Sequence, residues 1–372
     1  MKCVHCGKDS KYPDRTGKQC KGCKKAFAFE PKDGDKVTDM MFLNAVKAVS
    51  AEGRIRWGVE HLYYEVCRRK RAKAAPLGCV LVCLVAFTFS FVMLCSGVTA
   101  AGKKPGPVFF FGTFISGIFL LVTIATRFRS KFVVIEKEAF NRYWTRWVNV
   151  MGKPAGLIER TPEPQLPQDL EADIGDYSFD RAVICDRART VDLLVANNFH
   201  FENNCAVLSF DGYPKGVFGT IRTMLKRNPR LQVFVLHDVT VGGCGLAHKL
   251  ISDPHWFGGS GLRVIDLGLR PQHAGPFKGV LLRGVGPRVS DEPGISPAEA
   301  DWLTRHNLEL AAVRPEQVLK RLFAGLMAHA NDDPRTGDTG GAVMTCGAFD
   351  AGGYGGGDAG ALGGEGGADA FG

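Results

Sequence analysis

The chain has 372 residues and a formal net charge of +9, which gives room for two or three domains of ordinary size. The charge is uneven: residues 68–73 read RRKRAK, whereas residues 333–372 contain one Arg and no Lys. No secretory signal precedes the first of the 12 cysteines, which argues against a disulfide-stabilised secreted protein.

Two CxxC pairs lie at the start of the sequence. Cys3 and Cys6 form the first pair, and Cys20 and Cys23 form the second. Four thiolates at this spacing can form the tetrahedral set that structural zinc prefers. We therefore expect a zinc ribbon over residues 1–35, with zinc in a structural role because four protein ligands leave no open position. Such a ribbon could bind nucleic acid or protein, and the sequence does not choose between them.

Residues 36–76 are expected to form a helical segment of two helices. Thr38 can cap the first helix, and Gly53 can end it. The second helix contains the sequence HLYYEVCRR and has a plausible apolar face. This face consists of Trp57, Leu62, Tyr63 and Val66.

Two long uncharged stretches follow, at 77–100 and 105–126. Each is long enough to cross a hydrocarbon core of about 30 Å as a helix. We therefore expect a two-helix transmembrane hairpin over 77–126, with the lipid bilayer as a partner; the alternative is a buried helical pair. Lys and Arg are concentrated outside the hairpin, so both termini are expected in the cytoplasm, at the inner membrane if the protein is bacterial.

Three further segments are assigned from composition. Residues 127–152 are expected to form a juxtamembrane helix, with Trp144 and Trp147 at the membrane interface or in a core. Residues 153–175 contain four prolines and are expected to form a semi-rigid linker. Residues 331–372 are dominated by Gly with Asp and Ala, and are expected to be disordered.

Residues 176–330 alternate apolar strands with helices. The strands FDRAVIC, NCAVLSF, LQVFVLHD and LRVIDLGL predict a Rossmann-like α/β domain with a mostly parallel sheet covered on both faces. Polar side chains gather where these strands end, the edge at which open α/β sheets place their sites. Asp and Gly also end strands for reasons of turn geometry alone. The residues at this edge are Asp186, Arg187, Asp211, His237 and Asp238.

The order of these elements resembles the Toprim domain, in particular that of the topoisomerase VI A subunit and of related meiotic DNA-cleaving endonucleases. VICDRARTVDLL, CAVLSFDGYP and VFVLHDVTVGGCGLAHKL carry the resemblance, which covers residues 179–252. It implies a magnesium site that includes Asp186 and Asp238. The second carboxylate of the family's Asp-x-Asp motif falls on Thr240 here, so this site would lack one ligand and would hold magnesium weakly.

HLYYEVCRR also resembles the motif that carries the nucleophilic tyrosine of those enzymes, which would give Tyr64 a catalytic role. Such a tyrosine needs an adjacent base and a metal ion. An aromatic residue on a helix face is more often a packing residue.

Two functions are compatible with these features. The first is an integral membrane protein that presents a zinc ribbon and a degenerate Toprim-like domain to the cytoplasm, in a non-catalytic binding or scaffold role towards nucleic acid or a protein partner. The alternative is a membrane-tethered, magnesium-dependent nucleic-acid nicking or phosphotransfer enzyme that uses Asp186 and Asp238. The missing carboxylate at Thr240 favours the first. A generic nucleotide-binding domain is disfavoured, because there is no P-loop and GGCG lacks the GxGxxG pattern.

Overall fold

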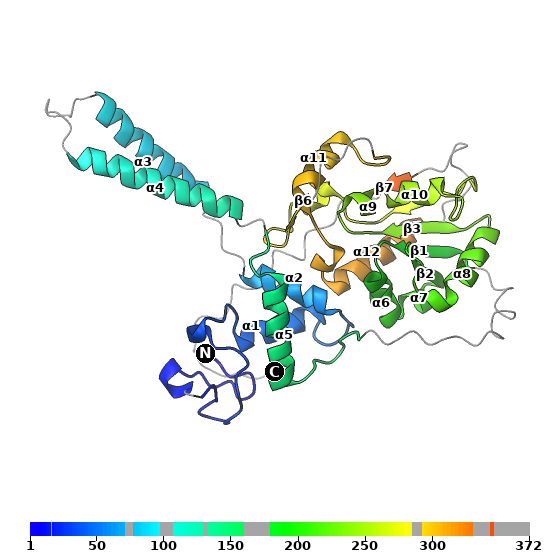
Figure 1. Cartoon of the computed structure of the whole chain (residues 1–372), viewed down its shortest axis with the longest axis horizontal. Helices are drawn as coiled ribbons and strands as arrows, with labels where there is room; N and C mark the ends of the chain where they lie inside the picture. Colours follow the sequence, from blue (N-terminus) through cyan, green and yellow to red (C-terminus); the bar gives the residue numbers. More distant parts are fainter. Residues whose placement is uncertain are drawn as a thin grey trace, which may run out of the picture.

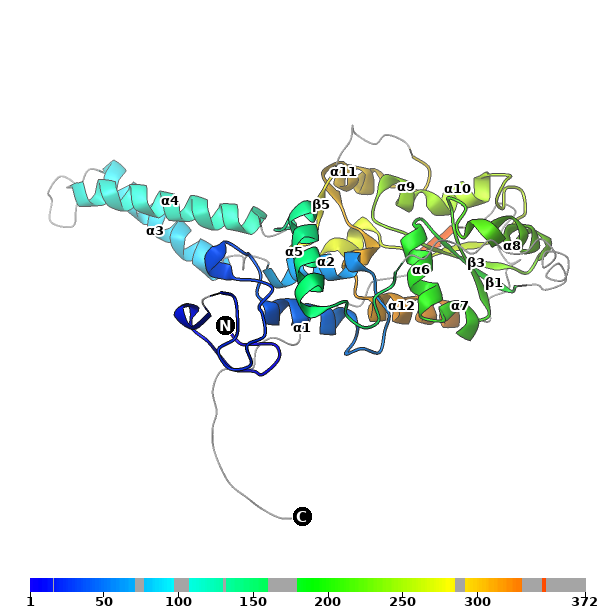
Figure 2. The ribbon, with the colours of Figure 1, turned by 60° about the horizontal axis from the view of Figure 1, so that its bottom comes forward.

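A computed structural model describes residues 1–15, 17–70, 77–96, 107–129, 132–159, 179–284, 292–329 and 343–345. Figure 1 shows an N-terminal ribbon, a group of helices beside it, an α/β domain, and a helical pair that projects from the rest. We use "helical module" for α1 (Asp39–Val49), α2 (Val59–Lys70) and α5 (Lys137–Met151). Figure 2 shows this module between the ribbon and the α/β domain.

The ribbon contains two matching turns and two short 3-10 helices. The turns are closed by isolated bridges between Lys2 and Asp9 and between Gln19 and Ala26. The 3-10 helices are η1 (Tyr12–Arg15) and η2 (Pro31–Asp33). A buried ion pair joins them: Arg15 donates from Nε and from a terminal nitrogen to the two carboxylate oxygens of Glu30, each at 2.9 Å.

The first helix begins and ends for local reasons. Thr38 is its N-cap, and its hydroxyl accepts a hydrogen bond from the Met41 amide, as the sequence predicted. Beyond Val49, three successive residues have positive φ, and Gly53 is the last of them, with φ +88°. This left-handed backbone cannot continue a right-handed helix, so the chain turns back towards α2.

The two tryptophans of α5 lie in a core. Trp147 is buried, and its ring centroid lies 4.8 Å from that of Phe42 in α1. Trp144 meets Trp57 edge to face at 6.4 Å. Of the two predicted environments, these contacts select core packing, at a typical geometry for aromatic pairs.

The projecting pair consists of α3 (Leu77–Ser96) and α4 (Pro107–Arg129). The helices pack closely, because a Cβ at Gly117 would lie 3.2 Å from the Phe87 ring. Large apolar side chains on both helices are exposed, including Val85 and Leu121.

Within the part of the chain that the structure describes, no helix is long and apolar enough to cross a membrane. This finding contradicts the predicted transmembrane hairpin at 77–126 and the integral membrane protein built on it. The lipid bilayer as a partner and the membrane location with cytoplasmic termini are withdrawn with it.

The α/β domain contains a parallel sheet, which confirms the predicted fold class for this region. Its strands are β1 (Arg181–Cys185), β2 (Cys205–Ser209), β3 (Gln232–Leu236), β4 (Val264–Asp266) and β7 (Val343–Thr345). Their order is β2-β1-β3-β4-β7, with every pair parallel. β7 lies inside the segment that was expected to be disordered; the other residues of that segment, from 331 on, lie outside the described residues.

Helices cover both faces of this sheet. Alternate strand residues contribute to two apolar clusters: Val183 and Phe234 face one, and Ile184 and Val235 face the other. Burial on both faces explains why the strands read as continuous apolar runs. The helices of the domain are α6 (Ala188–Ala196), α7 (Phe199–Glu202), α8 (Lys215–Arg227), α9 (Val241–Cys244), α10 (Leu246–Ser252), α11 (Pro297–Arg305) and α12 (Pro315–Ala328).

Smaller elements complete the domain. A two-stranded antiparallel ladder joins β5 (Leu282–Arg283) to β6 (His306–Asn307). Two further 3-10 helices are η5 (Pro271–Ala274) and η6 (Leu310–Ala312).

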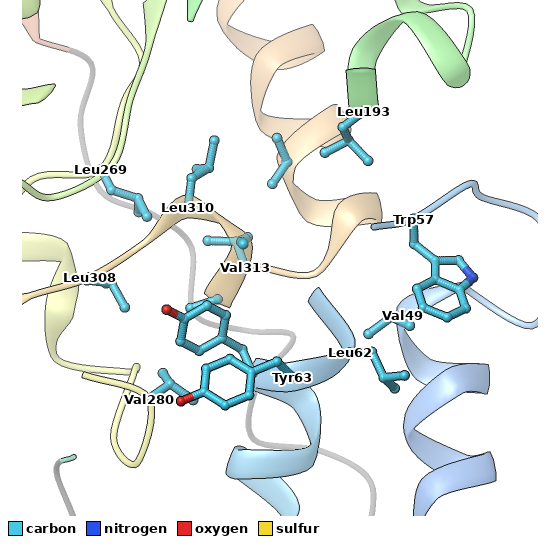
Figure 3. Packing of buried hydrophobic residues seen from close by; sticks show 14 of the residues in the cluster. Val49, Trp57, Leu62, Tyr63, Leu193, Leu269, Val280, Leu308, Leu310 and Val313 are labelled. Carbon is cyan, nitrogen blue, oxygen red and sulfur yellow. The ribbon is translucent and has the colours of Figure 1, made fainter. Parts of the chain in front are cut away.

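One apolar cluster runs from the helical module into the α/β domain without interruption. It contains Leu62 and Tyr63 of α2 together with Leu193 of α6 and Leu310 of η6. Figure 3 shows Trp57, Leu62 and Tyr63 in one field with Leu193, Leu310 and Val313. The helical module and the α/β domain therefore share a hydrophobic core.

Candidate functional site

The switch point of the sheet lies at the carboxyl ends of β1 and β3. These strands are neighbours, and the chain continues outward from them to β2 on one side and to β4 on the other. Open α/β sheets bind ligands at such a point. Asp186 follows β1 and Asp238 follows β3, so the two predicted acids do lie side by side: Asp186 accepts a hydrogen bond of 2.9 Å from the Asp238 amide.

Asp238 is held by three donors. One carboxylate oxygen accepts a 2.6 Å hydrogen bond from the amide of Leu310. The other accepts from Arg187 at 3.2 Å and from Arg189 at 3.3 Å. The carboxylate is fully buried, and these contacts supply the positive charge that a buried carboxylate requires.

Asp186 is less fully satisfied. One of its carboxylate oxygens accepts from the Asp238 amide, whereas the other, Oδ1, is buried with no hydrogen-bond partner. Burial, and then the nearby charge of Asp238, raises the pKa of Asp186 to about 7. The Asp186 carboxyl therefore binds a proton more readily near neutral pH than an exposed aspartate does.

His237 belongs to a buried ionic chain behind the two acids. Its Nδ1 lies 2.8 Å from the carbonyl oxygen of Asp238, and its Nε2 lies 2.9 Å from an Asp266 carboxylate oxygen. Burial alone would lower the pKa of His237, but the Asp266 charge and these hydrogen bonds raise it. Both ring nitrogens face acceptors, so the arrangement suits the doubly protonated ring.

Asp266 and two glycines keep this imidazole in place. The second carboxylate oxygen of Asp266 accepts hydrogen bonds of 3.0 and 2.7 Å from Arg270. A Cβ at Gly268 would lie 2.2 Å from the His237 ring, and one at Gly243 would lie 2.3 Å from the Asp238 carbonyl oxygen. Only glycine fits at these two positions, because the imidazole and the backbone occupy the space.

The remaining predicted edge residues line a cavity of about 270 Å³ beside Asp186. Asp211 is exposed at this cavity. Thr240 is the N-cap of α9, and its hydroxyl accepts a 3.1 Å hydrogen bond from the Gly243 amide. Thr240 therefore has a structural task at the position where the Toprim resemblance places a metal ligand.

Tyr64 lies in the core between the helical module and the α/β domain. It is 1% exposed. Burial, and then the adjacent Glu309 carboxylate, raises the pKa of Tyr64, so the hydroxyl stays protonated. Arg189 connects this tyrosine to the acid pair indirectly, because it contacts both Glu309 at 3.1 Å and Asp238. Tyr64 is therefore a packing residue of this core.

Magnesium does not fit the acid pair in this arrangement. Mg²⁺ binds through ionised carboxylates and waters, and both Asp238 oxygens already accept from nitrogen donors. Among the described residues, the four N-terminal cysteines form the only group of three or more Cys, His, Asp or Glu side chains that could share a metal ion.

The cysteine cluster has the geometry of a metal centre. The sulfur atoms of Cys3, Cys6, Cys20 and Cys23 all lie within 4.8 Å of one another. Two of the Sγ–Sγ distances, Cys3–Cys23 and Cys6–Cys20, are 3.6 Å, close to the edge of about 3.8 Å of a tetrahedron with metal–sulfur bonds of 2.3 Å. The predicted four ligands are therefore together and could hold a metal ion.

Backbone amides donate hydrogen bonds to two of these sulfurs. The amides of His5 and Gly22 each point at the sulfur two residues earlier, Cys3 and Cys20, at 3.4 Å. Backbone hydrogen bonds, first from Cys23 and then from Gly22, lower the pKa of Cys20 to about 6, whereas desolvation and the hydrogen bonds from the other cysteines raise the pKa of Cys23 to about 11. A thiolate at neutral pH is the form that binds metals.

Comparisons with known proteins give no relative: no family model, no curated protein and no solved structure matches this chain. Sequence reasoning missed several residues that complete the site. Asp266 lies inside the predicted strand LRVIDLGL, whereas the observed β4 is shorter and ends at it, so the edge rule missed it because the strand end was predicted too late. Glu309 and the Leu310 amide carry no such signal, since they reach Asp238 and Arg189 from a distant loop.

Proposed function

We propose that this chain is a non-catalytic binding protein, built from a zinc ribbon, a helical module and an α/β domain that resembles the Toprim domain. The observation that carries the proposal is the state of Asp238. Its carboxylate is buried and its oxygens accept from Leu310, Arg187 and Arg189. An internal salt bridge stands where the resemblance would require a magnesium ligand.

The other residues of the site support the same conclusion. Thr240 supplies a helix cap and no carboxylate. Tyr64 is buried and protonated, so it is neither accessible nor activated as a nucleophile. A nicking enzyme would need a charged metal site and an exposed nucleophile at the same edge.

Zinc is the ion we propose for the cysteine cluster. Four thiolates with tetrahedral spacing are typical of structural zinc, and they leave no open coordination position. When bound, the ion would cross-link residues 3–6 to residues 20–23. Its role would be to hold the ribbon folded.

Nucleic acid is the partner we propose for the ribbon. Eight of its lysines are exposed, and only Lys18 and Lys21 have ion-pair partners among the described residues. Exposed cations without partners attract phosphate backbones and release counterions on binding. The six lysines with no such partner are Lys2, Lys8, Lys11, Lys24, Lys25 and Lys32.

Catalysis is tested with the full chain, supercoiled DNA and single-stranded RNA in the presence of Mg²⁺ or Mn²⁺. We expect no cleavage. Mg²⁺-dependent cleavage that disappears in Asp238→Asn would contradict the non-catalytic proposal. Cleavage that persists in this variant would point to a contaminating nuclease.

Binding is tested by fluorescence anisotropy with DNA and RNA oligonucleotides at two salt concentrations. We expect affinity to fall steeply between 50 and 200 mM salt, and to fall further in the double variant Lys24→Gln/Lys25→Gln. Lys226→Gln/Lys320→Gln is the matched control, because both lysines are exposed and lie outside the ribbon. Equal binding by the two double variants would exclude the ribbon as the interface.

A further inference from the structure

A second cavity lies between the helical module and the α/β domain. Its volume is about 440 Å³, within the range of small-molecule sites. It is lined by the first turn of α2 with the preceding Gly58, by residues 187–192 around the start of α6, and by Ile158. Segments far apart in the sequence therefore converge on it.

Both helices present free backbone donors to this cavity. In α2 these are the amides of Val59 and Glu60, and in α6 they are the amides of Ala188 and Arg189. None of the four has a hydrogen-bond acceptor among the described residues. The first amides of a helix point outward at its positive end, where anions are stabilised.

His61 adds a side-chain donor to the lining of this cavity. It lines the cavity and is only 8% exposed. Its Nδ1 accepts a 3.3 Å hydrogen bond from the Gly58 amide, so in the neutral ring the proton is on Nε2. The Gly58 amide is the only hydrogen-bond partner of the His61 ring within the described part of the chain, so Nε2 is left without one. Burial lowers the pKa of His61 to about 4, so the ring is neutral at pH 7.

Arg187 supplies the positive charge. Its Nε contacts Asp238, and its side chain is 51% exposed. The terminal nitrogens of this guanidinium have no hydrogen-bond acceptor in the regions that the structure describes. A guanidinium with two free N–H groups matches two oxygens of a phosphate.

We propose that this cavity binds a small molecule that carries one phosphate group. The phosphate would accept from the first amides of α2 and α6, from His61 Nε2 and from Arg187. Glu60 and Asp192 also line the cavity; Asp192 accepts a hydrogen bond from the Tyr213 hydroxyl, and the negative charge of the two carboxylates disfavours a ligand that carries more than one phosphate. The site goes beyond the proposed non-catalytic role and does not depend on it.

The test is calorimetric titration of the full chain with inorganic phosphate, ribose 5-phosphate and ribose. We expect saturable binding of the phosphate compounds and none of ribose. His61→Phe keeps a buried ring without the donor, and Arg187→Leu removes the guanidinium at a half-exposed position. Each should weaken binding at least tenfold. The controls His255→Phe and Arg227→Leu alter exposed residues outside the cavity and should leave the affinity unchanged.

Thermal melting of each variant shows whether it is folded, and Arg187→Leu keeps the test decisive if His61→Phe does not fold. Absence of saturable phosphate binding by the folded native chain overturns the proposal. Equal affinity in the Arg187→Leu and Arg227→Leu variants overturns it as well. Nucleic-acid cleavage would contradict the proposed function and would leave this site untouched, so the two failures are distinguishable.

Discussion

The ribbon and the α/β domain are stabilised by different means. The apolar cluster of the ribbon contains Cys3, Cys20 and Phe27 as its buried members. The α/β domain buries whole strands between helices on both faces of its sheet. A ribbon this small cannot fold on apolar burial alone. The two CxxC turns of the ribbon therefore have four sulfurs at their centre, whereas Phe29 at the end of the ribbon and the strands of the α/β domain are held by close packing.

The largest effect is expected from Cys20→Ser. Structural zinc contributes on the order of 10 kcal/mol to the folding of small modules, so loss of one ligand should unfold residues 1–35. Metal analysis should show loss of the ion, and hydrogen exchange should show loss of protection in the ribbon while the sheet stays protected. Cys83→Ser, outside the cluster, is the control. A ribbon that keeps its protection without metal would remove the contrast between the two regions.

Glu65→Gln should destabilise the shared core by about 3–5 kcal/mol, because it leaves three partly buried arginines without their counter-charge. Glu65 is 1% exposed and contacts Arg68, Arg69 and Arg314. Chemical denaturation measures the loss, and Glu52→Gln at an exposed position should have little effect. The metal content of the ribbon should not change. A wild-type midpoint in Glu65→Gln would show that these ion pairs contribute little.

Leu322→Ala should lower the free energy of unfolding by about 2–5 kcal/mol, through lost burial and a residual cavity. Its neighbour on α12 provides an internal comparison, since Leu322 is 0% exposed and Phe323 is 50% exposed. Phe323→Ala should cost less than about 1 kcal/mol. Similar losses for both variants would mean that α12 is not packed as described.

His61 should make stability depend on pH. Its pKa is about 4 in the folded chain and near 6.5 when unfolded. Below pH 6.5 the unfolded chain therefore takes up a proton that the folded chain does not. This contribution is fully present above pH 6.5 and is lost as the pH falls to 4, by on the order of 3 kcal/mol.

The measurement is the denaturation midpoint between pH 7 and pH 4.5 in the native chain and in His61→Gln. The variant should lose less stability over this interval. His255→Gln, at an exposed histidine, should follow the native curve. Parallel curves for the native chain and His61→Gln would contradict the burial of this ring.

Thr240→Ala should have the smallest effect, a loss of about 1 kcal/mol from removal of a helix cap. The exposed Thr223 on α8 gives the control Thr223→Ala. Thr240→Asp tests the position further, because aspartate also caps helices and would restore the carboxylate that the Toprim resemblance places there. Thermal melting with and without Mg²⁺ distinguishes helix capping from metal binding by this aspartate, since a new metal site would add stability only with the ion.

The sequence predicted what is encoded locally. The CxxC pairs identified the cysteine cluster, and apolar runs such as LQVFVLHD identified the strands, because burial on both faces removes polar positions. The acids after β1 and β3 were placed together because parallel strands end at one edge. Hydrophobicity was less reliable between 77 and 126, where it predicted a membrane hairpin that the described residues do not support.

What the sequence could not predict depends on contacts between distant segments. The sequence around Asp238 gives no sign that the Leu310 amide donates a hydrogen bond to its carboxylate. The residue pattern of α2 suggested an apolar face, but it did not show that Arg314 of the α/β domain joins Arg68 and Arg69 at the Glu65 carboxylate. The short β7 lies in a Gly-rich segment, where composition argues against a strand.

The core shared by the helical module and the α/β domain also affects synthesis. The Arg68 side chain donates to the Ala312 carbonyl across 244 residues, and Arg314 reaches Glu65 across 249. A ribosome makes the helices of the module long before it makes the segment that covers them. Until then their apolar face needs temporary protection, by a chaperone or by non-native contacts. Such distant pairings slow folding, so we expect the body of this protein to become compact only near the end of translation, whereas the ribbon can close around its ion at the beginning.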